Sequence, residues 1–200
     1  MGADSGKSSG MSSFFALLFR LKYINRWGLM RSFRTENVSE HSLEVAMTAH
    51  ALAEIGVTYF NRDYNPANIA LKAMYHDVSE IFTGDLPTPI KYGTDDMKNC
   101  YKAIEKVAEI NLLDKLPEEL KRSYEKLILK QEDSREWRIV KAADKLCAYI
   151  KCLEEINSGN KEFTKAEEDI YKTLDITGID ELKYFMENFL PYFSNTIDEI

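Results

Sequence analysis

The stretch HDVSEIFTGDLPTP, at residues 76–89, constrains the fold more than any other part of the chain. Asn65 and Pro66 precede it and are typical of a helix N-cap followed by a proline in the first turn. The pattern predicts a helix that starts there and ends at Gly84, before two prolines that cannot continue it. The residues expected on its inward face recur at helical offsets. They are Ile69, Ala73, His76, Asp77 and Glu80.

A histidine beside an aspartate on an inward face needs a partner, because burying unpaired polar groups costs free energy. A metal ion is the candidate partner. The chain has three histidines, so each can be weighed. His50 has no acidic partner at a recognisable spacing, and we interpret it as structural. His41 lies near the start of a second predicted helix, and Asp144 lies on a largely apolar face of a third.

Each of these three predicted helices would place a histidine or aspartate, both common metal ligands, in the same core. Two imidazoles and two carboxylates suit a divalent transition-metal ion such as Mn²⁺, Co²⁺, Fe²⁺, Ni²⁺ or Zn²⁺. In an octahedral site they leave two positions open, one for water and one for a phosphate oxygen. No histidine follows His76, so we predict one metal ion rather than two. The predicted ligands are His41, His76, Asp77 and Asp144.

Helical periodicity covers most of the chain from residue 14 onward, and no alternating run is long enough for a sheet. Further helices are expected over residues 37–56, 96–114, 117–130 and 135–157. A last apolar stripe, over residues 182–193, is interrupted by a proline. Residues 1–13 are small and polar, and we expect them to form a disordered tail. The prediction is an all-α fold, with one domain over residues 14–200 and antiparallel helices around one core.

Composition and charge narrow the choice of partners. The 200 residues are 44% hydrophobic, which is enough for one domain with a sizeable core. A formal charge of −7 at pH 7 disfavours nucleic-acid polymers and anionic membranes as main partners, and no apolar run approaches a membrane span. The three cysteines form no CxxC motif and are odd in number. We therefore expect reduced thiols in a cytoplasmic protein.

The order of the predicted ligands matches the H…HD…D pattern of the HD-domain metal phosphohydrolases. Three longer segments are similar to the bacterial 5′-deoxynucleotidases of that superfamily (YfbR-like): INRWGLMRSFRTENVSEHSLEVA, ALKAMYHDVSEIFTGDLPTPIKY and KAADKLCAYIKCLEE. The resemblance covers nearly all of residues 14–200. It implies an HD-domain helical bundle with a single core metal and a homodimeric assembly. It also implies a metal-dependent phosphomonoesterase that removes phosphate from 2′-deoxynucleoside 5′-monophosphates.

The resemblance also implies substrate contacts at matching positions. Of the metal ligands, it places His41, Asp77 and Asp144 at the substrate as well. Arg26 would orient the phosphate, since a guanidinium can give a phosphate monoester two hydrogen bonds. Trp27 would lie beside it against the sugar, although a tryptophan at this position could equally be a core residue. A stiff loop would hold the deoxyribose and exclude a ribose by steric conflict: Asp85, Leu86, Pro87 and Thr88.

The resemblance makes Glu80 an essential catalytic acid, acting with Asp77 and Arg26. Glu80 is expected one turn beyond His76 on the same face, within reach of a proton on a metal-activated water. The alternative is that Glu80 forms a salt bridge with one of the nearby arginines, and the two roles are compatible.

Several alternatives stay open at this point. Arg31 and Arg34 lie in the same basic stretch as Arg26, but such residues more often form a solvated face. The apolar stripe through residues 182–193 is more often core than dimer interface. Two other functions fit a helical metal scaffold. One is a phosphodiesterase or nucleoside-triphosphate hydrolase, and the other is a non-catalytic module that binds a nucleotide or a metal.

Overall fold

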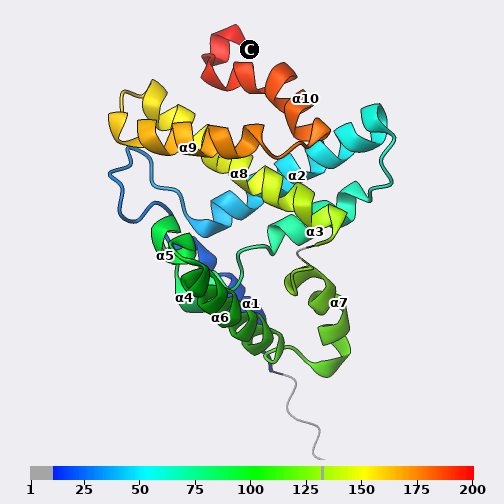
Figure 1. The fold of residues 1–200 in the computed structure, drawn as a ribbon. Helices are drawn as coiled ribbons and strands as arrows, with labels where there is room; N and C mark the ends of the chain where they lie inside the picture. The colour runs from blue at the N-terminus through cyan, green and yellow to red at the C-terminus, as the bar shows by residue number, and fades with distance from the viewer. Residues whose placement is uncertain (1–10, 132) are drawn as a thin grey trace, which may run out of the picture.

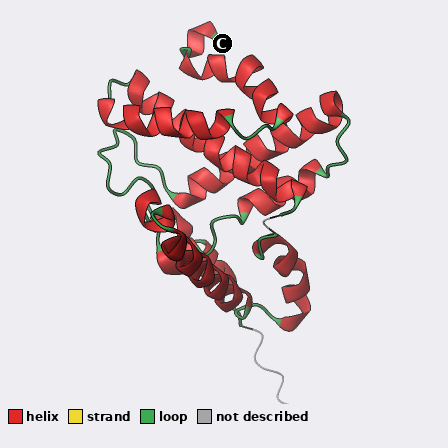
Figure 2. Cartoon of the chain, viewed as in Figure 1, coloured by secondary structure: helices red, strands yellow, loops and turns green. Residues whose placement is uncertain are grey.

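The computed structural model describes residues 11–131 and 133–200, and over these residues the chain is all-α (Figure 2). An isolated bridge joins Asn25 to Asn37, and no strand is formed in the described ranges. The α-helices are α1 (Phe14–Leu18), α2 (Val38–Phe60), α3 (Pro66–Met74), α4 (Glu80–Thr83), α5 (Thr88–Tyr92), α6 (Asp95–Leu113), α7 (Glu118–Ile128), α8 (Arg135–Asn157), α9 (Thr164–Asp175) and α10 (Asp180–Asn188). Short 3-10 helices are η1 (Leu21–Tyr23), η2 (Lys161–Phe163), η3 (Leu190–Ser194) and η4 (Ile197–Glu199). The expected tail falls mostly on residues 1–10, outside the described part of the chain.

Two hydrophobic clusters divide the core. Helices α2 and α8 are central to the first, and α3, α9 and α10 pack around them (Figure 1). The second cluster joins α1 and η1 to α6 and α7. Helix α2 passes from one cluster to the other, because Val38 belongs to the second and Val45 to the first. His41 therefore lies where the two clusters meet.

The predicted helix over residues 65–84 is interrupted in the structure. Helix α3 ends and α4 begins on either side of residues 75–79, which form turns. Nδ1 of His76 donates a hydrogen bond of 2.7 Å to the carbonyl of Ala73, the oxygen that a continuous α-helix would offer to the amide of Asp77. Bonds from the amides of Tyr75, His76 and Val78 to the carbonyl three residues earlier replace the helical ladder here. The His–Asp pair thus sits at a helix break.

Helix α2 begins as predicted, with Asn37 in a capping box, but it does not end at Gly56. It continues for one more turn and ends at Asn61, whose φ of 52° is the left-handed conformation common after a helix. A Cβ at Gly56 would lie 2.7 Å from the ring of Tyr64. Glycine is needed there for close packing, and it does not mark a helix end.

Helix α9 is absent from the sequence prediction, because its apolar stripe is thin. Leu174 is its one buried residue, and most of its other side chains are charged or polar. The interruption of the C-terminal stripe is confirmed, since α10 ends at Asn188 and Pro191 lies in η3. None of the described helices combines the length and apolar character needed to span a bilayer.

Candidate functional site

Four side chains from separate parts of the chain converge where the two hydrophobic clusters meet. His41 comes from α2, His76 and Asp77 from the turns between α3 and α4, and Asp144 from α8. Each offers a ligand atom, and these atoms all lie within 4.8 Å of one another. Nε2 of His41 is 2.9 Å from Oδ1 of Asp144, and Nε2 of His76 is 3.1 Å from Oδ2 of Asp77. The structure brings together all four predicted ligands.

The imidazole of His76 is oriented as a metal ligand. Its Nδ1 donates to the Ala73 carbonyl, so Nε2 is the nitrogen available to a metal ion. Nε2 is buried and makes no hydrogen bond to any described residue, although carboxylate oxygens of Asp77 and Asp144 lie 3.1 and 3.8 Å away. A nitrogen lone pair facing two carboxylates needs a shared cation or a proton between them. Two imidazole nitrogens and two carboxylate oxygens are a donor set that suits a borderline divalent ion.

The charges of this cluster depend on one another. Burial lowers the pKa of His76, but the carboxylates of Asp77 and Asp144 outweigh it and raise the pKa to about 10. Burial raises the pKa values of both aspartates, and their contacts with the two histidines outweigh it and lower them. The two carboxylates are thus ionised and attract a positive charge, which a divalent ion can supply.

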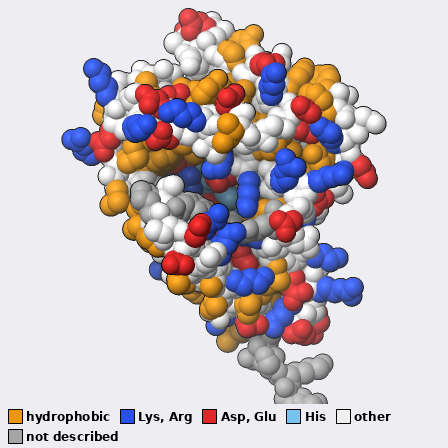
Figure 3. Space-filling model, in the orientation of Figure 1, with side chains coloured by type: hydrophobic (Ala, Val, Ile, Leu, Met, Phe, Trp, Pro, Cys, Tyr) orange, Lys and Arg blue, Asp and Glu red, His pale blue; other side chains and the backbone are white. Residues whose placement is uncertain are grey.

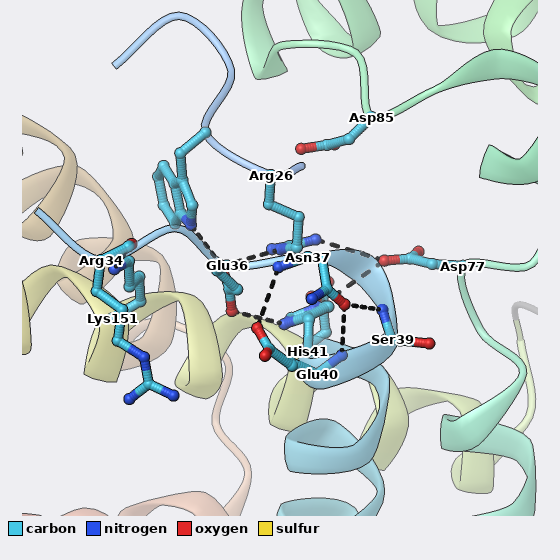
Figure 4. Close-up of polar contacts among 12 residues, drawn as sticks. Arg26, Arg34, Glu36, Asn37, Ser39, Glu40, His41, Asp77, Asp85 and Lys151 are labelled. Carbon is cyan, nitrogen blue, oxygen red and sulfur yellow. Dashed lines mark hydrogen bonds and ion pairs between the residues drawn. The ribbon is translucent and has the colours of Figure 1, made fainter. Parts of the chain in front are cut away.

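Arg26 lies directly beside the cluster (Figure 4). Its Nη1 is 3.5 Å from Oδ2 of Asp77, and its Nε donates to Oε2 of Glu36 at 3.2 Å. Burial lowers the pKa of Arg26, but Asp144, Asp77 and Glu36 raise it overall, so its charge is permanent. Trp27 follows it and donates from Nε1 to the same Oε2 of Glu36 at 2.7 Å. The structure thus places Arg26 at the cluster and the half-buried Trp27 next to it.

Glu80 is buried on the other side of Asp77, with its side chain 1% exposed. Its Oε1 accepts from Nζ of Lys91 at 2.7 Å, and Lys91 also lies 3.0 Å from Oδ1 of Asp85. Burial and the charge of Asp77 raise the pKa of Glu80, Lys91 partly offsets them, and the result is about 8. Oε2 of Glu80 is buried without a hydrogen-bond partner among the described residues. Glu80 thus forms a salt bridge with Lys91, and not with one of the nearby arginines as the alternative had it.

The loop after α4 occupies the position expected of it. Gly84 ends α4 with a φ of 69°, a left-handed conformation that glycine adopts at little cost. Asp85 is half-buried and its carboxylate is directed toward Arg26 (Figure 4). Leu86 and Pro87 are half-buried, and the exposed Thr88 begins α5.

Three other residues considered from the sequence lie outside this cluster. His50 is half exposed on α2, and the expectation that it has no acidic partner is wrong, since its Nε2 lies 3.7 Å from Oε1 of Glu54, one helical turn on. Arg31 is exposed and pairs with Glu162. The Arg34 side chain is also exposed, and its backbone amide donates to Glu155.

Sequence reasoning missed Glu36 and Lys91. Glu36 is adjacent to the N-cap of α2 and five residues before His41, which is a weak signal by itself. Lys91 lies eleven residues after Glu80, too far for a helical contact, and only the reversal of the chain after α4 brings the two together. A buried glutamate requires a cation, but the sequence does not say which one supplies it.

Comparison with known proteins identifies the relatives of this chain. The model of the family described as 5′-deoxynucleotidase YfbR-like matches residues 13–193. A 5′-deoxynucleotidase of Enterobacter sp. (strain 638) is 55% identical over 190 residues, which cover 94% of this chain and 96% of that protein. A 5′-deoxynucleotidase of Erwinia tasmaniensis is 56% identical with the same coverage. This chain belongs to the YfbR-like 5′-deoxynucleotidase family.

Solved structures place this YfbR-like chain in the HD-domain fold. An HD-domain phosphohydrolase of Listeria innocua superposes with a TM-score of 0.79 at 25% identity, covering 90% of this chain and 88% of the other. The HD phosphohydrolase DatZ of cyanophage S-2L, bound to dA and one catalytic Zn²⁺ ion, superposes with a TM-score of 0.62 at 19% identity. It covers 90% of this chain and 96% of its own, and at that identity it supports the fold alone. The predicted HD-domain bundle is confirmed.

Proposed function

We propose that residues 14–200 form a metal-dependent 5′-deoxynucleotidase, which hydrolyses 2′-deoxynucleoside 5′-monophosphates to a deoxynucleoside and phosphate. Relatives 55% and 56% identical over 94% of the chain bear the name 5′-deoxynucleotidase. The observation that carries the proposal is the permanent charge of Arg26 beside four convergent metal-ligand side chains. Figure 3 shows a histidine at the bottom of a hollow whose margin carries Lys and Arg side chains, so an anionic substrate meets positive charge there despite the net charge of −7.

His41, His76, Asp77 and Asp144 are the residues that would hold the ion. When bound there, a divalent ion such as Co²⁺ or Mn²⁺ supplies positive charge for the phosphate oxygens and lowers the pKa of water. Arg26 binds the phosphate through its guanidinium and stabilises the charge that develops during hydrolysis. Glu36 and Asp77 hold that guanidinium in place before the substrate arrives.

Glu80 moves a proton. The pKa of about 8 means that its carboxyl exchanges a proton close to neutral pH. Lys91 occupies Oε1 and leaves Oε2 as the exchanging atom. Hydrolysis of the monoester requires removal of a proton from the attacking water and delivery of one to the departing 5′-oxygen, and Oε2 of Glu80 is the group assigned to this transfer.

Trp27 and the loop Asp85–Thr88 select the sugar. One oxygen of Asp85 pairs with Lys91, and the other can accept a hydrogen bond from a 3′-hydroxyl. The loop is bounded by Gly84, which ends α4, and by Pro87, which caps α5. A fixed wall here excludes the added 2′-hydroxyl of a ribonucleotide.

A phosphate-release assay tests this function. Deoxy- and ribonucleoside monophosphates, a deoxynucleoside triphosphate and a phosphodiester are each incubated with Mn²⁺, Co²⁺ or Mg²⁺. Multiple-turnover release of orthophosphate from deoxynucleoside monophosphates is expected, with ribonucleotides cleaved more slowly. Pyrophosphate or triphosphate from the triphosphate, or cleavage of the diester alone, would instead indicate the corresponding other hydrolase. Binding of nucleotide without turnover would indicate a non-catalytic module.

The assembly and the compartment also belong to the proposal. We expect a homodimer, and α6 offers the face for it, since Met97, Ile104 and Val107 are 40%, 52% and 57% exposed on neighbouring turns. In the C-terminal stripe, Phe185 is core at 8% exposed, whereas Phe189 and Phe193 are 46% and 44% exposed. The three free cysteines, two of them buried, fit the predicted cytoplasmic location.

A further inference from the structure

Glu36 contacts three functional groups with a single carboxylate. Its Oε2 accepts hydrogen bonds from Nε of Arg26 at 3.2 Å and from Nε1 of Trp27 at 2.7 Å. Its Oε1 lies 3.5 Å from Nδ1 of His41, a buried nitrogen that makes no hydrogen bond to any described residue, and is the carboxylate oxygen beside it. Figure 4 shows Glu36 between Arg26 and His41. Its side chain is 8% exposed, so these partners take the place of water.

The geometry points to Glu36 as the positioning residue that sets the ligand tautomer of His41 and the placement of Arg26 and Trp27 together. This inference rests on the proposed function, because Arg26 and His41 matter through it. Glu36 is not assigned any contact with substrate.

The link to His41 works through its two ring nitrogens. A carboxylate near Nδ1 favours a proton on that nitrogen, which leaves the lone pair on Nε2. In this structure Nε2 faces Asp77 at 3.8 Å and hydrogen-bonds to Oδ1 of Asp144 at 2.9 Å, so it is the nitrogen that a metal ion would engage in place of that contact. Nδ1 of His76 donates to the Ala73 carbonyl at 2.7 Å, so both imidazoles of the cluster have an oxygen beside Nδ1 and direct Nε2 toward the aspartates.

The backbone at Trp27 gives independent support. Trp27 has a φ of 60°, a left-handed conformation that bulky residues rarely adopt. Such a conformation persists where surrounding contacts hold it. The indole bond to Glu36, the backbone bond from the Arg26 amide to the Glu36 carbonyl at 2.9 Å, and packing on Phe163 with ring centroids 5.3 Å apart supply those contacts.

Glu36→Gln separates this role from simple packing. An amide has one acceptor oxygen, so the variant cannot serve the donors of Arg26 and Trp27 and also accept from Nδ1 of His41. If the glutamine NH₂ is turned toward His41, it donates to Nδ1, and the ring proton then resides on Nε2. That tautomer leaves no lone pair on Nε2 for a metal ion. The matched control is Glu44→Gln, which removes an exposed carboxylate three residues after His41 on α2.

Two readouts need no substrate. The first is the dissociation constant for Co²⁺ or Mn²⁺, measured by competition with a chromophoric chelator, and Glu36→Gln should weaken it by roughly 10- to 100-fold. The second is the indole N–H signal in an amide correlation spectrum. The chain has two tryptophans, and Nε1 of Trp137 has no partner among the described residues, so it is an internal reference. The Trp27 signal, assigned with Trp27→Phe, should move upfield in Glu36→Gln while the Trp137 signal stays.

The outcomes are distinct. A metal affinity within twofold of wild type, or an unmoved Trp27 signal, in folded Glu36→Gln would overturn the inference. Weakened affinity in both Glu36→Gln and Glu44→Gln would also overturn it, because the effect would then be one of net charge. If Glu36→Gln does not fold by circular dichroism, Glu36→Asp keeps the charge but withdraws it by one methylene, and the same two readouts apply. Failure of wild type to release phosphate would reject the proposed function while both readouts still test Glu36.

Discussion

Nζ of Lys91 lies 2.7 Å from Oε1 of Glu80, and this contact joins α5 to the carboxyl that we assign to proton transfer. Burial and the charge of Asp77 raise the pKa of Glu80, and Lys91 lowers it in part. Lys91→Met should therefore raise the pKa of Glu80 above about 8. In the pH–kcat profile, the limb that reports Glu80 should therefore move to higher pH. Because the carboxylate form accepts the proton of the attacking water, kcat at pH 7 should fall.

Steady-state rates between pH 6 and 10 measure this shift. Lys98→Met, an exposed lysine on α6, is the control and should leave the profile unchanged. A profile for Lys91→Met that overlays the wild-type one would show that Glu80 does not set either limb.

Glu80 and Arg26 should differ in which kinetic constant they change. Glu80→Gln should retain its metal and its KM, while kcat falls by roughly 100- to 10,000-fold, as is typical for a lost general acid or base. Arg26→Ala should raise KM and lower kcat together, since it pairs with charge in ground and transition states. Arg26→Lys should restore only part of this, because an ammonium lacks the two-pronged geometry. Calorimetric binding with steady-state kinetics checks the scheme, and near-normal kcat in Glu80→Gln would leave that residue as a partner of Lys91 alone.

Metal content should follow the four ligands. Wild-type protein should hold one divalent ion per chain by elemental analysis, and His76→Ala or Asp77→Ala should lose it, because either change removes a ligand and leaves the opposing charges unpaired. His50→Ala is the matched control and should keep the ion, since His50 is half exposed and outside the cluster. Two ions per chain, or full occupancy in both ligand variants, would contradict a mononuclear site.

Glu155 should stabilise the segment that leads from Trp27 to Glu36. Burial raises its pKa, but Lys151, Asn160 and the backbone amides of Phe33 and Arg34 lower it to about 2. The stability gained from the ionised form is present above the ordinary pKa near 4.5 and is lost as pH falls toward 2. Glu155→Gln should cost about 1–3 kcal/mol at pH 7.

Urea unfolding at pH 7 and at pH 3 measures this cost, and the gap from wild type should narrow at the lower pH. Glu154→Gln, the exposed neighbour on α8, should be nearly neutral at both. A gap of equal size at both pH values would mean that the amide geometry, and not the charge, is what matters.

Dimerisation should depend on the apolar face of α6. Ile104→Asp places a charge on that face and should lower the mass seen by light scattering from twice 23.1 kDa to 23.1 kDa at micromolar concentration. Ile176→Asp applies the same change at an isoleucine that is 80% exposed and should leave the mass unchanged. A monomer mass for the wild type would remove the dimer from the proposal.

Much of this fold follows from sequence because its signals are local. The Asn37 capping box, the helix over residues 135–157 and the stop at Gly84 each depend on residues within a few positions of one another. The break at residues 75–79 does not, because it depends on the His76 side chain competing for a backbone carbonyl. Gly56 was misassigned for a similar reason, since its contact with Tyr64 becomes visible only once the chain has turned back.

The same distinction between local and tertiary signals applies to the candidate site. Its four candidate metal ligands could be predicted, because histidines are few and the helical spacing groups each with apolar positions, although His76 and Asp77 lie in turns and not in a helix. The contacts of Glu36 and Lys91 could not, because each joins residues whose relation is set by loop geometry and not by helical periodicity. Local pattern thus finds the groups that could hold a metal ion, and tertiary structure finds the residues that contact them.

The position of the ligands between two hydrophobic clusters has a consequence for heat inactivation. Among the described residues, the first cluster contains nineteen buried residues and the second eight. The His76–Asp77 turns lie between Ala73 of the first and Val78 of the second, so opening of either cluster separates the ligands. We therefore expect activity to disappear on heating when the smaller cluster around Phe14 and Leu112 opens, while far-ultraviolet circular dichroism still records intact α2 and α8.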